Sequence, residues 1–141
     1  MTFLANNYNR KKISFKKGIG SYLVATNGKK YLDFCSGIAV NSLGHANPRL
    51  VKALYKQAKK VWHVSNAFTI PEGEMLAKKL VKKTFADSVI FQNSGTEATE
   101  AAIKVARRYF YSIGKPKKNR ILCVKNSFHG RTIAAIFASG S

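Results

Sequence analysis

The sequence predicts an α/β fold built on a parallel sheet, and three patterns in its second half support this. Val89-Ile90-Phe91 is a short apolar run, an Ala-rich helical pattern extends from Thr96 to about Ile113, and Arg120–Val124 is a second apolar run. This order predicts a strand–helix–strand unit from Ser88 to Val124 with a right-handed crossover. Continuous apolar strands are typical of parallel sheets that are covered on both faces.

Length and composition indicate one modest domain with an apolar core. The chain has 141 residues, 45% of them hydrophobic and nine of them Phe, which argues against disorder. No apolar run approaches the roughly 20 residues of a membrane span, and no signal peptide is visible at the amino terminus. We therefore expect a cytoplasmic protein without a membrane partner.

The formal net charge of +19 raises nucleic-acid binding as an alternative function. Nineteen of the 25 basic residues are Lys, and they fall as scattered pairs. Pairs at helical spacing, such as Lys78-Lys79 and Lys82-Lys83, are typical of the solvated faces of amphipathic helices. Nucleic acid is therefore not the expected partner, and a small basic module that binds nucleic acid or a phosphorylated ligand is kept as the alternative of another class.

The first part of the chain predicts a loose arm, a hairpin and a small-residue loop. Residues 1 to about 17 are polar, basic and aperiodic, which indicates an arm. Tyr22–Ala25 and Tyr31–Phe34 are predicted strands, because Asn27-Gly28 between them is a strong hairpin signal. The Gly-rich stretch Cys35–His45 fits either a close backbone approach to a ligand or an ordinary connecting loop.

Two amphipathic helices are expected before the strand–helix–strand unit. Asn47-Pro48 begins the first helix, with Asn as the N-cap and Pro at the first helical position. Thr69–Glu72 has the spacing of a capping box and begins the second helix. Apolar residues at helical spacing predict the buried stripe of each helix. These are Leu50, Val51, Leu54, Ala58, Val61 and Trp62 in the first, and Met75, Leu76, Leu80 and Val81 in the second.

Ser94-Gly95-Thr96 lies where the first predicted strand turns into the long helix. Ser94 and Glu97 fit a capping box, which by itself predicts a structural cap and no ligand. Gly95 favours a phosphate site as well, because Gly inside a helix costs ~1 kcal/mol relative to Ala. A Gly there removes the side chain that would block a phosphate, and Thr96 adds a hydroxyl. The free N–H groups and the positive end of the helix dipole would hold the anion.

A second polar loop, residues 126–132, follows the second predicted strand. Ligands bind at the carboxyl ends of parallel strands, so the two loops are expected to face one crevice. Phe128 offers a flat face for a planar ring, Gly130 permits a tight turn, and Arg131 offers a planar fork for a carboxylate or phosphate. Taken alone, Phe128 is better explained as a buried aromatic residue, and Arg131 as a surface charge, than as ligand-binding residues. Together with the phosphate cup, they fit pyridoxal 5′-phosphate and an amino-acid substrate.

The same residues carry a resemblance to the class III pyridoxal-phosphate aminotransferases. Three stretches resemble signatures of this family in its order and at its spacing: Asn93–Ala98, Phe128–Thr132, and Gly37–His45 followed by Pro48. Others look most like the acetylornithine aminotransferase branch, namely Trp62–Asn66, Phe68 and Thr84–Asp87. The resemblance extends from about Gly18 to the end of the chain.

This resemblance implies a fold-type I architecture, with a large domain around a mostly parallel sheet and a small domain built from both chain ends. Residues 1–45 would form an N-terminal arm and hairpin that contribute to the small domain, and residues 46–141 the first, incomplete part of the large domain, which binds pyridoxal phosphate. It also implies a homodimer with amino-acid and 2-oxo-acid substrates. Gly95 and Thr96 match the phosphate-binding pair, with Ser94 beside them in the predicted cofactor site. Phe128 matches the residue stacked on the cofactor ring, and Arg131 matches the arginine that binds a substrate carboxylate.

The resemblance further implies amino transfer from N-acetylornithine, or a related omega-amino donor, to 2-oxoglutarate in arginine biosynthesis. Ornithine, succinyldiaminopimelate and 4-aminobutyrate aminotransferases are the alternatives within the family. The family's chemistry needs a Lys that bonds covalently to the cofactor and an acid beside the pyridine nitrogen, and no residue here matches either in context. We therefore assign no catalytic residue and no metal ligand. The sequence is expected to be the N-terminal portion of an aminotransferase, inactive on its own.

Overall fold

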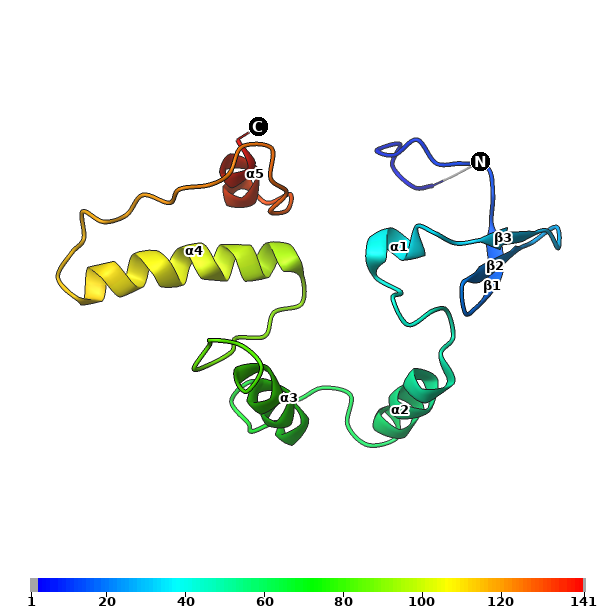
Figure 1. Ribbon diagram of the computed structural model, residues 1–141, viewed down its shortest axis with the longest axis horizontal. Coiled ribbons are helices and arrows are strands. Elements are labelled where there is room, and N and C mark those ends of the chain that lie inside the picture. Colours follow the sequence, from blue (N-terminus) through cyan, green and yellow to red (C-terminus); the bar gives the residue numbers. More distant parts are fainter. Residues whose placement is uncertain (1–2, 141) are drawn as a thin grey trace. The chain divides into compact units, whose positions relative to one another are not determined.

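The computed structural model describes residues 3–140, which divide into two compact units at Phe68 and Thr69. The first unit holds strands β1, β2 and β3 and helices α1 and α2, and the second holds helices α3, α4 and α5 (Figure 1). The predicted assignment of residues 1–45 to a small domain and residues 46–141 to a large domain concerns the assembled enzyme, and it stays a prediction.

The first unit contains a three-stranded antiparallel sheet in the order β1-β2-β3 (Figure 1). Strand β2 (Tyr22–Ala25) pairs with β3 (Lys30–Leu32), which confirms the predicted hairpin. At its turn, Asn27 Oδ1 accepts a hydrogen bond from the Lys29 N–H at 3.0 Å, and Gly28 has a φ of 87°. A positive φ is what an Asn-Gly hairpin turn requires.

Strand β1 (Phe15–Ile19) overlaps the stretch that was predicted to be a loose arm. It pairs with β2 through an irregular register, with a shift between Phe15 and Lys17. Phe15 packs edge-on against Tyr31, with ring centroids 5.7 Å apart. The arm prediction is wrong for this part, because the irregular register breaks the two-residue alternation that signals a strand.

The Gly-rich stretch after the sheet forms a left-handed turn, α1 (Ser36–Ala39). Its four residues have φ values of 39°, 67°, 62° and 61°, a region that residues other than Gly rarely adopt. Asp33 accepts hydrogen bonds from the N–H groups of Cys35 and Ser36, and pairs with His45 Nε2 at 2.6 Å. These bonds, with His45 the largest cause, hold the pKa of Asp33 below its ordinary value. One carboxylate thus anchors both ends of the strained loop.

Helix α2 (Pro48–Ala58) begins as predicted. Asn47 Oδ1 accepts hydrogen bonds from the N–H groups of Arg49, at 3.0 Å, and Leu50, at 3.4 Å. The predicted buried stripe is wrong, however, because Leu54 and Trp62 are 73% and 88% exposed. Within the first unit, no other helix or strand packs against α2. The amphipathic pattern is present, but its apolar face is uncovered.

Helix α3 (Pro71–Val81) also forms where expected, but without the predicted capping box. Ile70 occupies the N-cap position, and no side chain caps the helix. Pro71 explains this start, because proline at the first helical position has the right φ and no N–H to satisfy. The residues predicted to face inward are largely exposed, Met75 at 59% and Leu76 at 49%.

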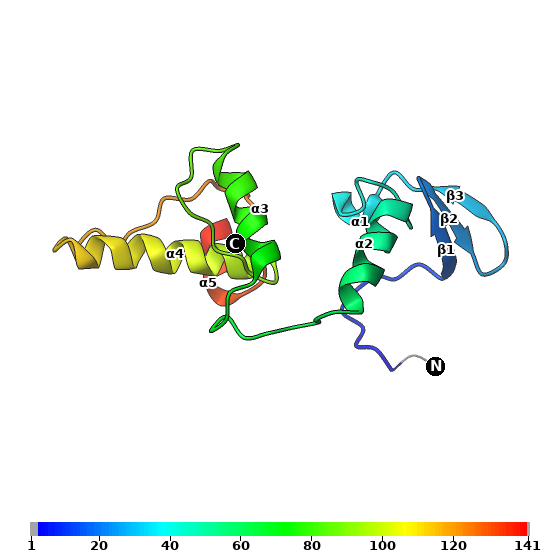
Figure 2. The same ribbon diagram turned by 90° about the horizontal axis from the view of Figure 1, so that it is seen from below.

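Helix α4 (Gly95–Ser112) confirms the predicted long helix and ends just before Gly114, whose φ is 74°. Helix α5 (Ile133–Ser139), which the sequence patterns did not predict, lies beside the first turns of α4 (Figure 2). Ala135 of α5 is fully buried at this contact. This is the one packed helix pair among the residues that the structure describes.

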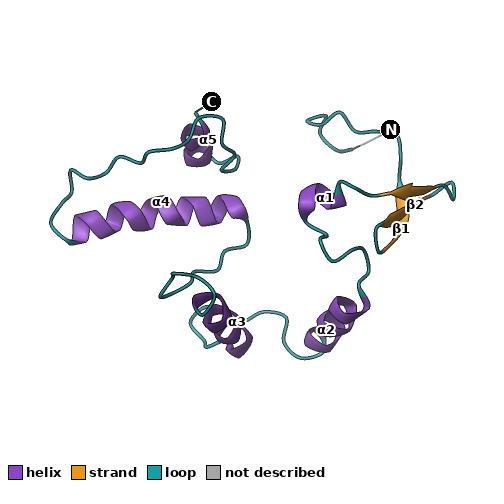
Figure 3. Cartoon of the chain, viewed as in Figure 1, coloured by secondary structure: helices purple, strands orange, loops and turns teal. Residues whose placement is uncertain are grey.

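The two predicted strands that flank α4 are not formed. Ser88–Gln92 and Arg120–Val124 run as loops, and neither pairs with another backbone segment of the described chain (Figure 3). A strand needs a neighbour to accept and donate its backbone hydrogen bonds, and the one sheet within residues 3–140 lies in the other unit. Leu122 and Val124, expected inside a covered sheet, are 100% and 77% exposed.

The apolar core is correspondingly small. Ala25 and Ala135 are the fully buried apolar residues within the described range. Each contributes little, because the free energy of burial is about 25 cal/mol per Å² of apolar surface. Among residues 3–140, no helix has the length and apolar character needed to cross a bilayer.

We expect the 141-residue chain on its own to show no cooperative thermal transition, because so few of its apolar side chains are packed. Its circular dichroism should decline gradually on heating, and a dye that binds exposed apolar surface should fluoresce strongly before heating begins. A soluble monomer with a single sharp calorimetric transition would contradict this expectation.

Candidate functional site

Ser94 and Glu97 form a reciprocal cap at the start of α4. Ser94 Oγ accepts a hydrogen bond from the Glu97 N–H at 3.4 Å and donates to Glu97 Oε2 at 2.8 Å. The Asn93 side-chain amide donates to Glu97 Oε1 at 3.3 Å. The predicted capping box is therefore confirmed, and the Ser94 hydroxyl is already used within it.

These bonds shift the titration of Glu97. The hydrogen bond from the Ser94 hydroxyl, followed by the one from Asn93, holds the pKa of Glu97 below its ordinary value. An ionised carboxylate in the first turn also interacts favourably with the positive end of the helix dipole. The cap is consequently strongest when Glu97 is charged.

Gly95 and Thr96 keep their backbone N–H groups available for a ligand. An α-helix leaves its first four N–H groups without helical partners. Here these groups belong to Ser94, Gly95, Thr96 and Glu97, because the Ala98 N–H makes the first regular helical bond, to the Ser94 carbonyl at 3.1 Å. The Ser94 hydroxyl accepts the Glu97 N–H, whereas the N–H groups of Gly95 and Thr96 have no such acceptor among the described residues. Apart from the adjoining residues and the backbone of α4 itself, no atom lies within 4 Å of where a Cβ on Gly95 would be. Free donors in front of open space fit a phosphate group.

Thr96 directly contacts the second predicted loop. Thr96 Oγ1 and Thr132 Oγ1 are 3.2 Å apart, and Thr132 Oγ1 donates to Glu100 Oε1 at 2.6 Å. Gly130, with a φ of 124°, lies so close to Thr96 that a Cβ on Gly130 would overlap the Thr96 side chain. The structure thus brings the Ser94–Thr96 turn and the 128–132 loop together at the start of α4.

Phe128 and Arg131 lie on this second loop and are both exposed, Phe128 to 78%. The base of the loop is held by Ser127, whose Oγ donates to the Val124 carbonyl at 2.6 Å and lies 2.9 Å from His129 Nε2. The Phe128 ring is therefore open to a planar ligand. The assignment of Phe128 to a cofactor ring and of Arg131 to a carboxylate stays a prediction.

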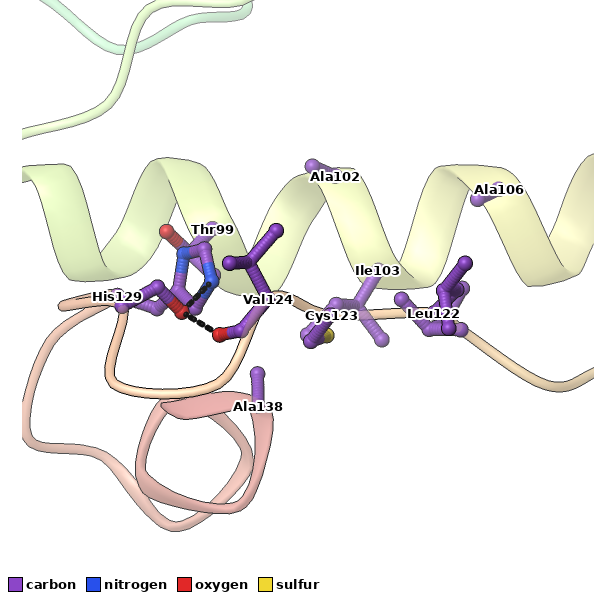
Figure 4. Close-up of a pocket in the computed structure, with 11 residues that line it drawn as sticks. Thr99, Ala102, Ile103, Ala106, Leu122, Cys123, Val124, His129 and Ala138 are labelled. Carbon is purple, nitrogen blue, oxygen red and sulfur yellow. Dashed lines mark hydrogen bonds between the residues drawn. The ribbon is translucent and has the colours of Figure 1, made fainter. Parts of the chain in front are cut away.

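A separate apolar groove of about 490 Å³ runs along α4 (Figure 4). Ala102 and Ala106 of α4 form one side, and Leu122, Cys123 and Val124 form another. None of the predicted cofactor or substrate residues lines it, and it contains no Lys, Arg, Asp or Glu. The groove therefore suits apolar packing and not an anionic ligand.

The sequence patterns did not assign a role to Glu100 or Thr132. Glu100 is four residues after Thr96, so both side chains lie on one face of a helix. The four-residue spacing could therefore have indicated that Glu100 lies near Thr96. Thr132 lies 36 residues from Thr96, and no local pattern indicates a contact over such a separation.

Comparisons with known proteins identify the family to which the chain is similar. The family described as aminotransferase class III matches residues 3–141. The chain is 54% identical over 137 residues to the acetylornithine aminotransferase of Agrobacterium fabrum, an alignment that covers 97% of this chain and 34% of that protein. It is 52% identical over 141 residues to the acetylornithine aminotransferase of Aquifex aeolicus, covering 99% of this chain and 37% of that one.

Solved structures of aminotransferases also match the chain. The N-acetylornithine aminotransferase from Stenotrophomonas maltophilia matches with a TM-score of 0.78 at 40% identity, over 87% of this chain and 34% of that chain. The ornithine aminotransferase from Toxoplasma gondii matches with a TM-score of 0.85 at 30% identity, over 94% of this chain and 32% of that chain. The chain spans about a third of the length of these relatives.

Substituting Gly130→Ala should loosen the 128–132 loop from α4. Alanine would have to adopt a φ of 124° and displace the Thr96 side chain. We expect exchange at the hydrogen-bonded amides 136–139 of α5 to rise about tenfold, equivalent to about 1.4 kcal/mol of lost local stability. Gly114→Ala is the matched control, because Gly114 has a φ of 74° and no other part of the chain near its Cβ position. Equal exchange at residues 136–139 in the two variants would argue against the contact.

Ser94→Ala should raise the pKa of Glu97 toward its ordinary value of 4.5, because the largest cause of the lowering is removed. Since the pKa is lower in the folded state, ionised Glu97 stabilises the first turn above pH 4.5, and that stability is lost as pH falls through the folded pKa. Carbon NMR titration of the Glu97 carboxyl measures the shift. Ser112→Ala, which removes a hydroxyl bonded to the Arg108 carbonyl at the other end of α4, should leave the titration unchanged. A Glu97 pKa that is the same with and without Ser94 would rule out this cap.

Proposed function

Because the chain belongs to the class III aminotransferase family, we propose that it supplies the phosphate- and carboxylate-binding loops of an enzyme that transfers an amino group from N-acetylornithine to 2-oxoglutarate. The observation that carries this proposal is the junction of Thr96 with Gly130 and Thr132. It joins a turn with free anion donors to a loop with an exposed aromatic ring and an arginine. Such an enzyme would act in arginine biosynthesis.

The residues have distinct roles in this proposal. The N–H groups of Gly95 and Thr96 bind the cofactor phosphate, and Ser94 holds the turn in shape through Glu97. Phe128 packs on the cofactor ring, and Arg131 binds a substrate carboxylate through its guanidinium fork. Pyridoxal 5′-phosphate, the cofactor of this family, supplies an electron sink for chemistry at the amino-acid Cα.

The identity of the relatives supports N-acetylornithine as the amino donor. The acetylornithine aminotransferases of Agrobacterium fabrum and Aquifex aeolicus are 54% and 52% identical to this chain and that of Stenotrophomonas maltophilia is 40% identical, whereas the ornithine aminotransferase from Toxoplasma gondii is 30% identical. Ornithine is the second candidate donor, since that structure aligns over 94% of the chain. We further propose a homodimer in the cytoplasm, and the uncovered apolar face of α2 supports assembly with further protein.

Gly95→Ala tests the phosphate assignment, because it should weaken ligand binding while strengthening the helix. The added methyl group would occupy the space in front of the free N–H groups, whereas Ala inside a helix is favoured over Gly by ~1 kcal/mol. Pyridoxamine 5′-phosphate is the suitable probe, since it has no aldehyde to react with the 19 Lys residues. Titration calorimetry at physiological salt should show about a tenfold loss of affinity.

Two controls separate this site from general attraction to a basic chain. Pyridoxamine, which lacks the phosphate, should bind the parent chain and Gly95→Ala equally weakly. If both chains bind the phosphorylated probe equally, and salt abolishes that binding, the charge alone holds the ligand and the basic-module alternative is favoured. Amino transfer by the 141-residue chain is not expected, because none of its lysines has the family's cofactor-binding context.

A further inference from the structure

Glu100 and Thr132 form a hydrogen-bonded link between α4 and the second loop. Thr132 is the N-cap residue of α5, yet its side chain makes no capping bond to that helix. Its hydroxyl instead donates to Glu100 Oε1 at 2.6 Å and lies 3.2 Å from Thr96 Oγ1. A side chain in a capping position that bonds across to another helix indicates a role beyond local helix formation.

The proton positions in this link follow from simple counting. A threonine hydroxyl has one proton, and a carboxylate can only accept. Thr132 therefore donates its proton to Glu100, and Thr96 must be the donor in the bond between the two threonines. The Thr96 hydroxyl consequently has no proton left for a phosphate.

A carboxylate this near the turn is not a phosphate ligand, because like charges repel. The two threonines account for its position instead. Through Thr132, Glu100 sets where the 128–132 loop lies relative to the turn, and the close approach of Gly130 to Thr96 defines the spacing. Phe128 and Arg131 are part of that loop.

We propose that Glu100 is a positioning residue: acting through Thr132, it places the loop with Phe128 and Arg131 beside the Ser94–Thr96 turn and keeps the Thr96 hydroxyl proton in the bond to Thr132. The cofactor phosphate is then bound by backbone N–H groups, while the ring and the substrate carboxylate depend on Glu100. This inference rests on the proposed function. The inference goes beyond the proposed function because it assigns placement of the cofactor ring to Glu100, a residue that touches neither cofactor nor substrate.

The test compares two probes in two variants of the 141-residue chain. Inorganic phosphate reports on the turn alone, and pyridoxamine 5′-phosphate reports on the turn and the loop together. In Glu100→Ala, the ratio of the affinity for pyridoxamine 5′-phosphate to that for phosphate should fall about three- to tenfold, the effect of one net hydrogen bond. Glu100→Gln should keep most of the parent ratio, since its amide oxygen still accepts the Thr132 proton. A general loss of helix structure would instead lower both affinities together.

Glu74→Gln is the matched control, because it removes one negative charge from the exposed first turn of α3 and should leave the ratio unchanged. Thr132→Val removes the hydrogen bond to Glu100 without changing a residue of α4. It therefore tests the proposal even if Glu100→Ala reduces the helix signal in circular dichroism. An unchanged ratio in Thr132→Val, or an equal loss in Glu100→Gln and Glu100→Ala, would overturn the proposal.

Hydrogen exchange without any ligand distinguishes a failure of this inference from a failure of the proposed function. Exchange at the hydrogen-bonded amides 136–139 of α5 should be about three- to tenfold faster in Glu100→Ala than in Glu74→Gln. If exchange follows this pattern but the parent chain does not bind pyridoxamine 5′-phosphate, the proposed assignment of the turn and the loop to the cofactor is wrong and the link is only structural. Unchanged exchange in Glu100→Ala overturns the link itself.

Discussion

The close approach of Gly130 to Thr96, with the Thr96–Thr132 hydrogen bond beside it, is the contact on which the second unit depends. It closes a long connection that leaves α4 at Ser112 and returns to the start of the same helix. Closing such a loop costs conformational entropy. Apolar burial offsets little of this cost, because few apolar side chains among the described residues are buried. Polar bonds and one glycine contact therefore determine where α5 begins.

Most features that depend on neighbouring residues could be predicted from the sequence, the capping box at Thr69–Glu72 being the exception, whereas strand pairing and helix packing, which depend on distant partners, could not. The Asn47 cap, the Asn27-Gly28 turn and the Ser94–Glu97 cap each involve residues within four positions, and all three form. Strand β1 was not predicted because its irregular register interrupts the two-residue alternation by which a strand is recognised. Helix α5 was not predicted because it is short and its N-cap residue, Thr132, bonds to α4 across 32 positions.

The apolar patterns of the sequence predict buried faces that are exposed in both units of the structure. Leu54 in α2 and Val124 after α4 were expected to be covered, and both are exposed. An amphipathic helix or an apolar strand encodes the face that will be buried, but not the segment that buries it. The relatives that match this chain are about three times as long. In the candidate site, by contrast, residues 94–96 and 128–132 meet within one unit, and their meeting needs no further segment.

The use of the Ser94 hydroxyl within its own cap has a consequence for sequence divergence. In the proposed site the anion donors are main-chain groups, so position 94 is constrained by helix initiation and not by ligand chemistry. Asp and Asn cap helices about as well as Ser, and Thr somewhat less well, so homologues are free to exchange these residues there while the proposed ligand meets an unchanged backbone. Position 94 is therefore a place where natural variation carries information about the fold and none about the substrate.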